Sequence, residues 1–204
     1  MSARHRWLIV AALAAVTAAA PAPAAAQDWQ NDVRIRLGWW IPEDLPTDPG
    51  FIPAIEVRNL VTDRDGIAYG IGYYHEKRTE DENLRFGSTP ERFRFEADVE
   101  IIPVTISWFH IWPRAYVTWY AGAGGGIYVV DALSQGYSLD SNFKIFDYGD
   151  FRELEDGTYI GAHAFGGIDF FPDSRWGAMA ELRFHLIEED YSAAEISAGA
   201  LFRF

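Results

Sequence analysis

The chain has 204 residues, no cysteine and a formal net charge of −13. Disulfides, thiol nucleophiles and thiolate metal sites are therefore excluded, and so acidic a chain without a basic patch is unsuited to binding nucleic acid. Aromatic residues make up 16% of the sequence, and membrane interfaces are one place where Trp and Tyr collect.

The first 26 residues have the features of a cleaved signal peptide. Arg4 and Arg6 give a basic start, residues 7–20 form an apolar run, and three alanines precede Gln27. The run is too short for a spanning helix, which needs about 20 apolar residues. We expect residues 1–26 to be a signal peptide and residues 27–204 to form one domain.

The remaining chain alternates between apolar and polar residues in eight segments, and none shows a sustained helical period. Most of the segments reach the roughly 9–11 residues of a tilted transmembrane strand. In chain order the expected strands are Val33–Ile41, Phe51–Val61, Ile67–His75, Arg92–Phe109, Tyr116–Val130, Tyr159–Phe171, Trp176–Ile187 and Glu195–Phe204.

The connections between these segments alternate in length. Three are short turns rich in Asp, Gly and Pro, namely Thr62–Gly66, His110–Ala115 and Pro172–Arg175. Four are longer, namely Pro42–Gly50, Glu76–Glu91, Asp131–Thr158 and Glu188–Ala194. Outer-membrane barrels have short periplasmic turns and longer external loops. The pattern predicts an all-β fold, an eight-stranded antiparallel up-and-down transmembrane β-barrel in the cell outer membrane.

The fourth segment changes phase near its middle. Phe93 to Ile101 keep apolar residues at odd positions, whereas Val104 to Trp108 keep them at even positions. A β-bulge inserts one residue and so changes the phase of a strand, and proline is tolerated at bulges. We therefore expect a bulge at Ile102-Pro103.

Aromatic residues lie near the expected strand ends. Trp39, Trp40, Tyr73, Tyr74 and Tyr128 are expected in the outer interface belt, where amphipathic rings suit the head-group level. Phe202 and Phe204 close the last strand. An aromatic terminus of this kind is what a barrel presents to the barrel assembly machinery, so we expect these two residues to form the assembly signal.

The residues resemble the small OmpA-like outer-membrane barrels, a broad family that includes the OmpX and OmpW types. The resemblance covers the whole chain after the leader. It is carried by Glu100-Ile101-Ile102-Pro103-Val104-Thr105, by Tyr116-Val117 leading to the glycine-rich run Ala121–Gly126, by Gly161–Gly167 and by the terminal Phe204. It implies the barrel class, with outer-membrane lipid and lipopolysaccharide as its surroundings.

The alternation also predicts a charged barrel interior. The interior of an eight-stranded barrel is just wide enough for side chains to fill it, and a charge buried there must be paired. Both signs are present in similar numbers, so we expect a salt-bridge plug rather than a gated path. The expected lumen residues are Arg34, Arg36, Glu56, Arg58, Glu96, Asp98, Glu100, His163, Asp169, Glu181, Arg183, His185 and Arg203.

Catalytic and metal sites receive little support. Ser107 and Ser197 are the inward serines, and a match of Ser197 with His185 and Glu181 stays open, although a nucleophile needs a base within hydrogen-bond reach. No ligand spacing supports a metal at His163 and His185. We expect no catalytic residue, no cofactor and no metal.

The connection Asp131–Thr158 combines acidic and aromatic residues. Connections of this length are usually functional or disordered, so we expect a binding surface for an unidentified ligand here. Its acidic residues, such as Asp147, Asp150 and Asp156, do not match a calcium loop.

Three functions stay open on the sequence. The favoured one is a structural or surface-interaction barrel of the cell envelope with a plugged lumen. The alternatives are a narrow OmpW-like channel for small hydrophobic solutes and a lipid-acting outer-membrane enzyme.

Overall fold

The computed structural model describes residues 31–43, 48–86, 89–114, 116–139, 145–170, 174–188 and 191–204. The expected signal peptide lies outside these residues, and its cleavage stays a prediction. Within the described ranges no helix has the length and apolar character needed to cross a membrane.

The described chain is all β, with each strand antiparallel to its neighbours. The strands are β1 (Asn31–Pro42), β2 (Gly50–Leu60), β3 (Asp65–Gly72), β4 (Tyr74–Phe86), β5 (Thr89–Pro113), β6 (Val117–Leu139), β7 (Ile145–Phe170), β8 (Trp176–Ile187) and β9 (Ala193–Arg203). The order of pairing is β3-β2-β1-β9-β8-β7-β6-β5-β4.

A further pairing between β3 and β5 closes the sheet into a barrel. β3 and β4 are two halves of one wall, separated only at Tyr73, and both pair with β5 in a single register (Ile71 with Val104, Tyr74 with Ile101). The ring therefore has eight walls, as the sequence predicts. The break coincides with a backbone bond of 3.0 Å from the Tyr73 N–H to the Pro53 carbonyl.

The barrel has its apolar residues on the outside. Ile35, Leu37, Leu182, Phe184 and Leu186 are all more than 40% exposed on the outer wall, while charged residues on the same strands are buried inside. A water-soluble barrel would bury the apolar face, whereas a bilayer solvates apolar side chains and leaves the polar ones to the interior. The wall is therefore built to face lipid.

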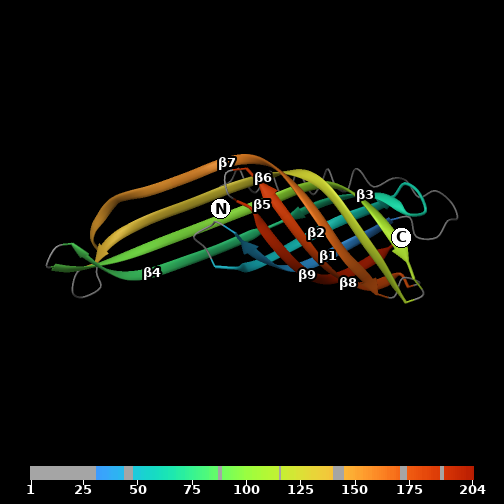
Figure 1. Ribbon diagram of the computed structural model, residues 1–204, viewed down its shortest axis with the longest axis horizontal. Helices are drawn as coiled ribbons and strands as arrows, with labels where there is room; N and C mark the ends of the chain where they lie inside the picture. The colour runs from blue at the N-terminus through green and yellow to red at the C-terminus, as the bar shows by residue number, and fades with distance from the viewer. Residues whose placement is uncertain are drawn as a thin grey trace.

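Half of the barrel extends far beyond the other half. β4, β5, β6 and β7 run on together as a long sheet that leaves the barrel at one end (Figure 1). The expected loops Glu76–Glu91 and Asp131–Thr158 are therefore wrong for most of their length. They are antiparallel hairpins in continuous register, with irregularities in β6 and β7 only between Gln135 and Leu139. We refer to the part of β4–β7 beyond Tyr74 and Ile101 as the projecting sheet.

The expected bulge at Ile102-Pro103 is also wrong. The register of β5 with β6 is unbroken through Ile101, Ile102 and Pro103. Odd-numbered residues face inward along the whole middle of β5, from Ala97 to Phe109. The alternation of apolar and polar residues in the sequence changes phase because the barrel interior is polar beside Thr105 and apolar at Ile101. The outer face changes in the opposite sense.

Glycines in β6 let neighbouring strands approach closely. An added Cβ at Gly124 would overlap the Ile106 carbonyl oxygen, whereas at Gly166 of β7 the nearest atom would be 3.6 Å away. Gly124→Ala should therefore force β5 and β6 apart and lower the free energy of unfolding by about 1–3 kcal/mol. Urea unfolding in lipid vesicles measures this, and Gly166→Ala is the matched control. Equal stability of the two variants would contradict the close approach.

Candidate functional site

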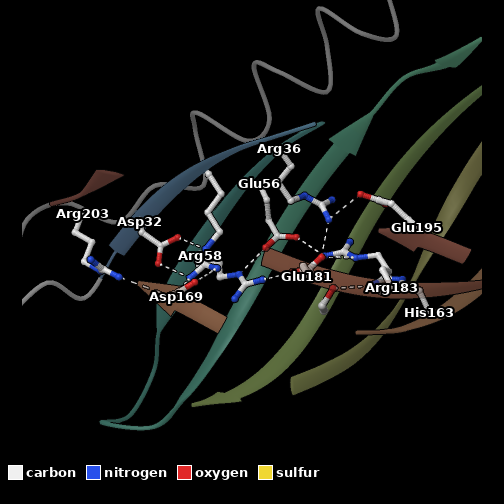
Figure 2. Close-up of polar contacts among 12 residues, drawn as sticks. Asp32, Arg36, Glu56, Arg58, His163, Asp169, Glu181, Arg183, Glu195 and Arg203 are labelled. Carbon is white, nitrogen blue, oxygen red and sulfur yellow. Dashed lines mark hydrogen bonds and ion pairs between the residues drawn. The ribbon is translucent and has the colours of Figure 1, made fainter. Parts of the chain in front are cut away.

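The barrel interior is held by a network of arginines and carboxylates (Figure 2). At its centre Glu181 accepts hydrogen bonds from Arg36 (2.6 Å), Arg58 (2.9 Å) and Arg183 (3.0 Å). Glu56 lies between Arg58 and Arg183, with contacts of 2.5 and 2.7 Å. All five side chains are almost fully buried. Each carboxylate thus bridges at least two guanidinium groups, which is the geometry that planar arginine provides.

A second group of charges continues the network toward the end of the barrel that is opposite the projecting sheet. Arg34 makes a two-pronged contact with Asp169, at 2.8 and 2.7 Å, and a second one with Asp32, at 2.7 and 3.1 Å. Arg203 lies 3.8 Å from Asp169. Because β1, β7 and β9 supply these residues, the contacts connect strands that lie far apart in the sequence.

Two histidines continue the network toward the projecting sheet. His185 contacts Glu195 at 3.3 Å and the Tyr128 hydroxyl at 2.9 Å. His163 contacts the Ser107 hydroxyl at 2.6 Å. All of these side chains are buried, so the two histidines are part of the interior packing.

Apolar and aromatic side chains fill the rest of the interior. On the side of the projecting sheet, Trp40, Tyr74, Ile101, Tyr128 and other residues form a buried cluster across the barrel. Trp40, Tyr74 and Tyr128 therefore lie inside the barrel, and the expectation that these three residues belong to the outer belt is wrong. At the level where the outer wall becomes polar, the barrel interior is therefore apolar instead of charged.

A second cluster lies among the arginines, toward the end of the barrel that is opposite the projecting sheet. The Arg58 guanidinium lies 4.2 Å from the ring centre of Tyr120 and 4.9 Å from that of Phe109, and the Arg183 guanidinium lies 4.6 Å from that of Phe165. Cations over aromatic faces are attracted by the ring quadrupole. The rings thus complete the surroundings of the guanidinium faces that no carboxylate covers.

The structure brings ten of the thirteen expected lumen residues together inside the barrel. They are Arg34, Arg36, Glu56, Arg58, His163, Asp169, Glu181, Arg183, His185 and Arg203. The expectation is wrong for Glu96, Asp98 and Glu100, which alternate with the inward residues Ala97, Val99 and Ile101 and lie on the outer face. The expected bulge would place these three carboxylates on the inward face of β5. Because the strand has no bulge, they point outward.

Sequence reasoning missed two members of the network. Glu195 is buried against Arg36 and His185, and Asp32 contacts Arg34. Glu195 shares the inward phase of Arg203 in the last strand, so the alternation itself could have identified it. Asp32 lies one residue before the expected start of the first strand. The observed strand begins at Asn31, so it includes Asp32 on the same face as Arg34.

The interior serines and histidines are not arranged as a catalytic triad. His185 contacts Glu195 and Tyr128, and the Ser197 hydroxyl has no hydrogen-bond partner among the described residues. The contact between Ser107 and His163 resembles a nucleophile and base. Within the described part of the chain, however, the second ring nitrogen of His163 has no partner to orient it, and both side chains are buried. No group of three or more metal-ligating side chains occurs among the described residues.

The outer face of the projecting sheet is charged. His75 contacts Asp98 at 2.9 Å, and the Lys77 ammonium lies 3.9 Å from Asp98 and 4.0 Å from Glu96. Farther out Arg94 donates to Asp81 at 2.7 and 3.0 Å, and this bond raises the pKa of Arg94. On β5 the outer face is polar and the inner face is apolar at Ala97, Val99 and Ile101, which is the arrangement that water favours.

Both sides of the projecting sheet end in a strand with one open edge. Among the described strands β4 pairs with β5 alone, and residues 145–158 of β7 pair with β6 alone. An open edge offers a row of backbone donors and acceptors to another strand. Charged residues occupy β4 on both of its faces, and such residues discourage indiscriminate pairing of an edge.

Of the two aromatic residues expected to form the assembly signal, Phe202 lies in β9 and Phe204 directly follows the end of that strand. The Phe202 ring packs on Trp176 with centroids 4.7 Å apart, and Phe204 lies 6.3 Å from Phe202. Their role in assembly stays a prediction.

Known structures share this architecture. The N-terminal β-barrel domain of Pseudomonas aeruginosa OprF superimposes with a TM-score of 0.51 at 11% identity, covering 87% of this chain and 100% of that one. Neisserial surface protein A gives 0.49 at 16% identity (85% and 96% covered), and Ail of Yersinia pestis gives 0.48 at 15% (85% and 96%). No protein-family model and no curated protein sequence matches the chain.

The likeness to the OprF barrel shows the fold. Together with the closed ring, the lipid-facing apolar wall and the charged interior, it defines the fold as that of a small outer-membrane β-barrel.

Glu181 is the carboxylate on which the network should depend most. Glu181→Gln leaves Arg36, Arg58 and Arg183 with an uncompensated buried charge, so we expect unfolding in lipid vesicles to require about 3–5 kcal/mol less. Asp98→Asn removes a half-exposed carboxylate from the outer face and should cost less than about 1 kcal/mol. A Glu181 variant as stable as the Asp98 variant would contradict the role of the network.

Proposed function

We propose that this protein is a non-conducting barrel that anchors a surface-interaction sheet in the outer membrane. The observation that carries the proposal is the interior network of Arg36, Arg58 and Arg183 with Glu56 and Glu181, in which all five side chains are at most 4% exposed. A path for solutes would need water molecules beside these charged groups. The groups instead contact one another, which argues against such a path.

The apolar cluster around Trp40, Tyr74 and Tyr128 supports the same conclusion. It lies across the barrel on the external side of the charges, and each of these three side chains is fully buried. An ion entering from outside would have to cross this apolar layer before it reached a carboxylate. Two barriers of opposite chemistry therefore lie in series.

The projecting sheet is the part of the molecule suited to a partner. Residues 145–158 of β7 and the strand β4 each present an open backbone edge, and peptides bind such edges by adding a strand. The expected binding surface at 131–158 thus becomes a sheet edge rather than a loop. A partner segment with an extended backbone and side chains complementary to a charged strand fits this edge.

The two alternative functions lack comparable support. A narrow channel conflicts with the buried, mutually paired charges. A lipid-acting enzyme needs a nucleophile that lipid can reach, and Ser107 and His163 are each only 3% exposed.

Liposomes carrying the refolded barrel should show negligible release of a small trapped solute, because the interior charges and the apolar cluster leave no continuous wet path. Heat-modifiable gel migration verifies folding, and a general porin serves as the positive control for the assay. Solute release well above that of empty liposomes would overturn the non-conducting barrel.

The interaction role is tested by shortening the projecting sheet. Joining Arg78 to Ala97 and Ala132 to Glu155 with tight turns preserves cross-strand neighbours and removes both distal hairpins. Vesicles carrying the full barrel should bind to members of an array of immobilised surface proteins and glycans, and the shortened barrel should lose that binding while staying folded and non-conducting. Binding that survives the shortening would place the interaction elsewhere.

A further inference from the structure

The charges inside the barrel balance without any contribution from histidine. The interior of the described chain holds five arginines and five carboxylates, namely Arg34, Arg36, Arg58, Arg183 and Arg203 with Asp32, Glu56, Asp169, Glu181 and Glu195. Each lies 2.5–3.8 Å from an opposite charge. His163 and His185 are buried in the same space, at 3% and 2% exposure. A proton on either histidine therefore gives the interior a cation in excess.

His185 lies where the charged network meets the apolar cluster. Its Nε2 atom contacts Glu195 of β9 at 3.3 Å, and its Nδ1 atom lies 2.9 Å from the hydroxyl of Tyr128 of β6. The Trp40 ring of β1 packs against the imidazole with centroids 4.6 Å apart. A neutral ring satisfies both polar partners, because one nitrogen donates to the carboxylate and the other accepts from the phenol. A protonated ring donates from both nitrogens and so ends the bond from the Tyr128 hydroxyl.

The carboxylates around His185 are already bound to guanidinium groups. The second oxygen of Glu195 accepts from Arg36 of β1 at 3.2 Å. Arg183 lies two residues before His185 on β8 and donates to Glu56 of β2 at 2.7 Å. A proton on His185 would therefore compete for a carboxylate that a buried arginine uses.

His163 of β7 is the direct cross-strand neighbour of His185. The two rings lie with centroids 5.9 Å apart. The Nε2 atom of His163 contacts the Ser107 hydroxyl of β5 at 2.6 Å, and its Nδ1 atom is buried without a hydrogen-bond partner among the described residues. A neutral ring can leave that nitrogen as an unprotonated acceptor. A charged ring must place a donor there, and a buried donor without an acceptor is costly.

The charges that act on His163 are mainly cationic. Arg183 and Arg36 act on it as cations and Glu56 acts on it as an anion. Glu56 is itself bound by Arg58 and Arg183. An imidazolium at this position would therefore be a buried charge without a counter-ion of its own, which costs several kcal/mol in a protein interior.

We propose that His163 and His185 make the barrel an acid-sensitive structure, which is locked while both rings are neutral and loosens when they take up protons. The added cations repel one another and Arg183, the Tyr128 hydroxyl loses its bond to His185, and water enters to solvate the new charges. The loosening depends on the barrel interior alone, so it occurs whether or not the projecting sheet binds a partner. The non-conducting barrel proposed above is the state at neutral pH.

Linkage between protonation and folding gives the direction of the effect. In an unfolded chain a histidine takes up a proton near its ordinary pKa of about 6.5, whereas the folded interior has no place for the charge. Stability is therefore fully present above about pH 6.5 and is lost as the pH falls. Each histidine should lower the folding equilibrium constant up to about 25-fold between pH 7 and pH 5. Carboxylates, with ordinary pKa values of about 4, contribute little over this range.

Urea unfolding of the full barrel in lipid vesicles at pH 7 and pH 5 tests the proposal. The folding equilibrium constant of the native barrel should fall by more than about 25-fold. His185→Gln keeps a donor for Glu195 and an acceptor for Tyr128, and either His185→Gln or His163→Gln should remove about half of the effect on a logarithmic scale. His75→Gln is the matched control, because its side chain is 46% exposed on the outer face, and it should keep the full effect.

The native barrel also allows a direct test if a variant does not fold. In NMR spectra of barrel with 15N-labelled histidine at pH 6, His163 and His185 should show neutral rings while His75 is largely protonated. Charged rings at both buried positions would overturn the proposal. So would a folding equilibrium constant that falls less than about threefold from pH 7 to pH 5, or that falls equally in the native barrel and in both glutamine variants.

Discussion

The structure depends on the mutual neutralisation of charges inside the barrel. Turning the apolar side chains toward lipid leaves arginines and carboxylates as the filling of a space too narrow for bulk water. A single unpaired ion there would cost several kcal/mol, so the interior is stable only because Glu56 and Glu181 are each shared by two or three guanidinium groups. The strands, the apolar wall and the closure of the ring all require that this pairing succeed.

The second determinant is the change of solvent along the strands. Away from the projecting sheet β5 presents Ile106 and Trp108 to lipid and Ser107 to the interior. Toward the projecting sheet the same strand presents Glu100 and Asp98 outward and Ile101 inward. One uninterrupted register thus serves two environments, and the amino-acid pattern reverses where the bilayer ends. The long sheet beyond that level follows the rules of a water-soluble protein.

Much of this could be predicted from the sequence, because alternation with period two reports which face meets lipid. It identified the eight walls, and the boundaries Trp176–Ile187 agree with the structure. It failed at Glu96, Asp98 and Glu100, since a reversal of solvent and an inserted residue produce the same change of phase in a sequence. The partners of each arginine, and the contact of Ser107 with His163, depend on side chains from strands far apart, which no local pattern encodes.

The ion pairs of the interior also bear on the order of assembly. Arg36 and Glu181 are separated by 145 residues in the chain, and Arg58 and Glu181 by 123. Until the strands at the two ends of the chain approach one another, Arg36 of β1 lacks its carboxylate partners, and Arg58 and Glu181 each keep only the partner on their own strand. A partly assembled sheet must therefore keep these groups hydrated, and the water can leave only as the last seam closes. Dehydration of the interior and completion of the ring are in this sense a single event.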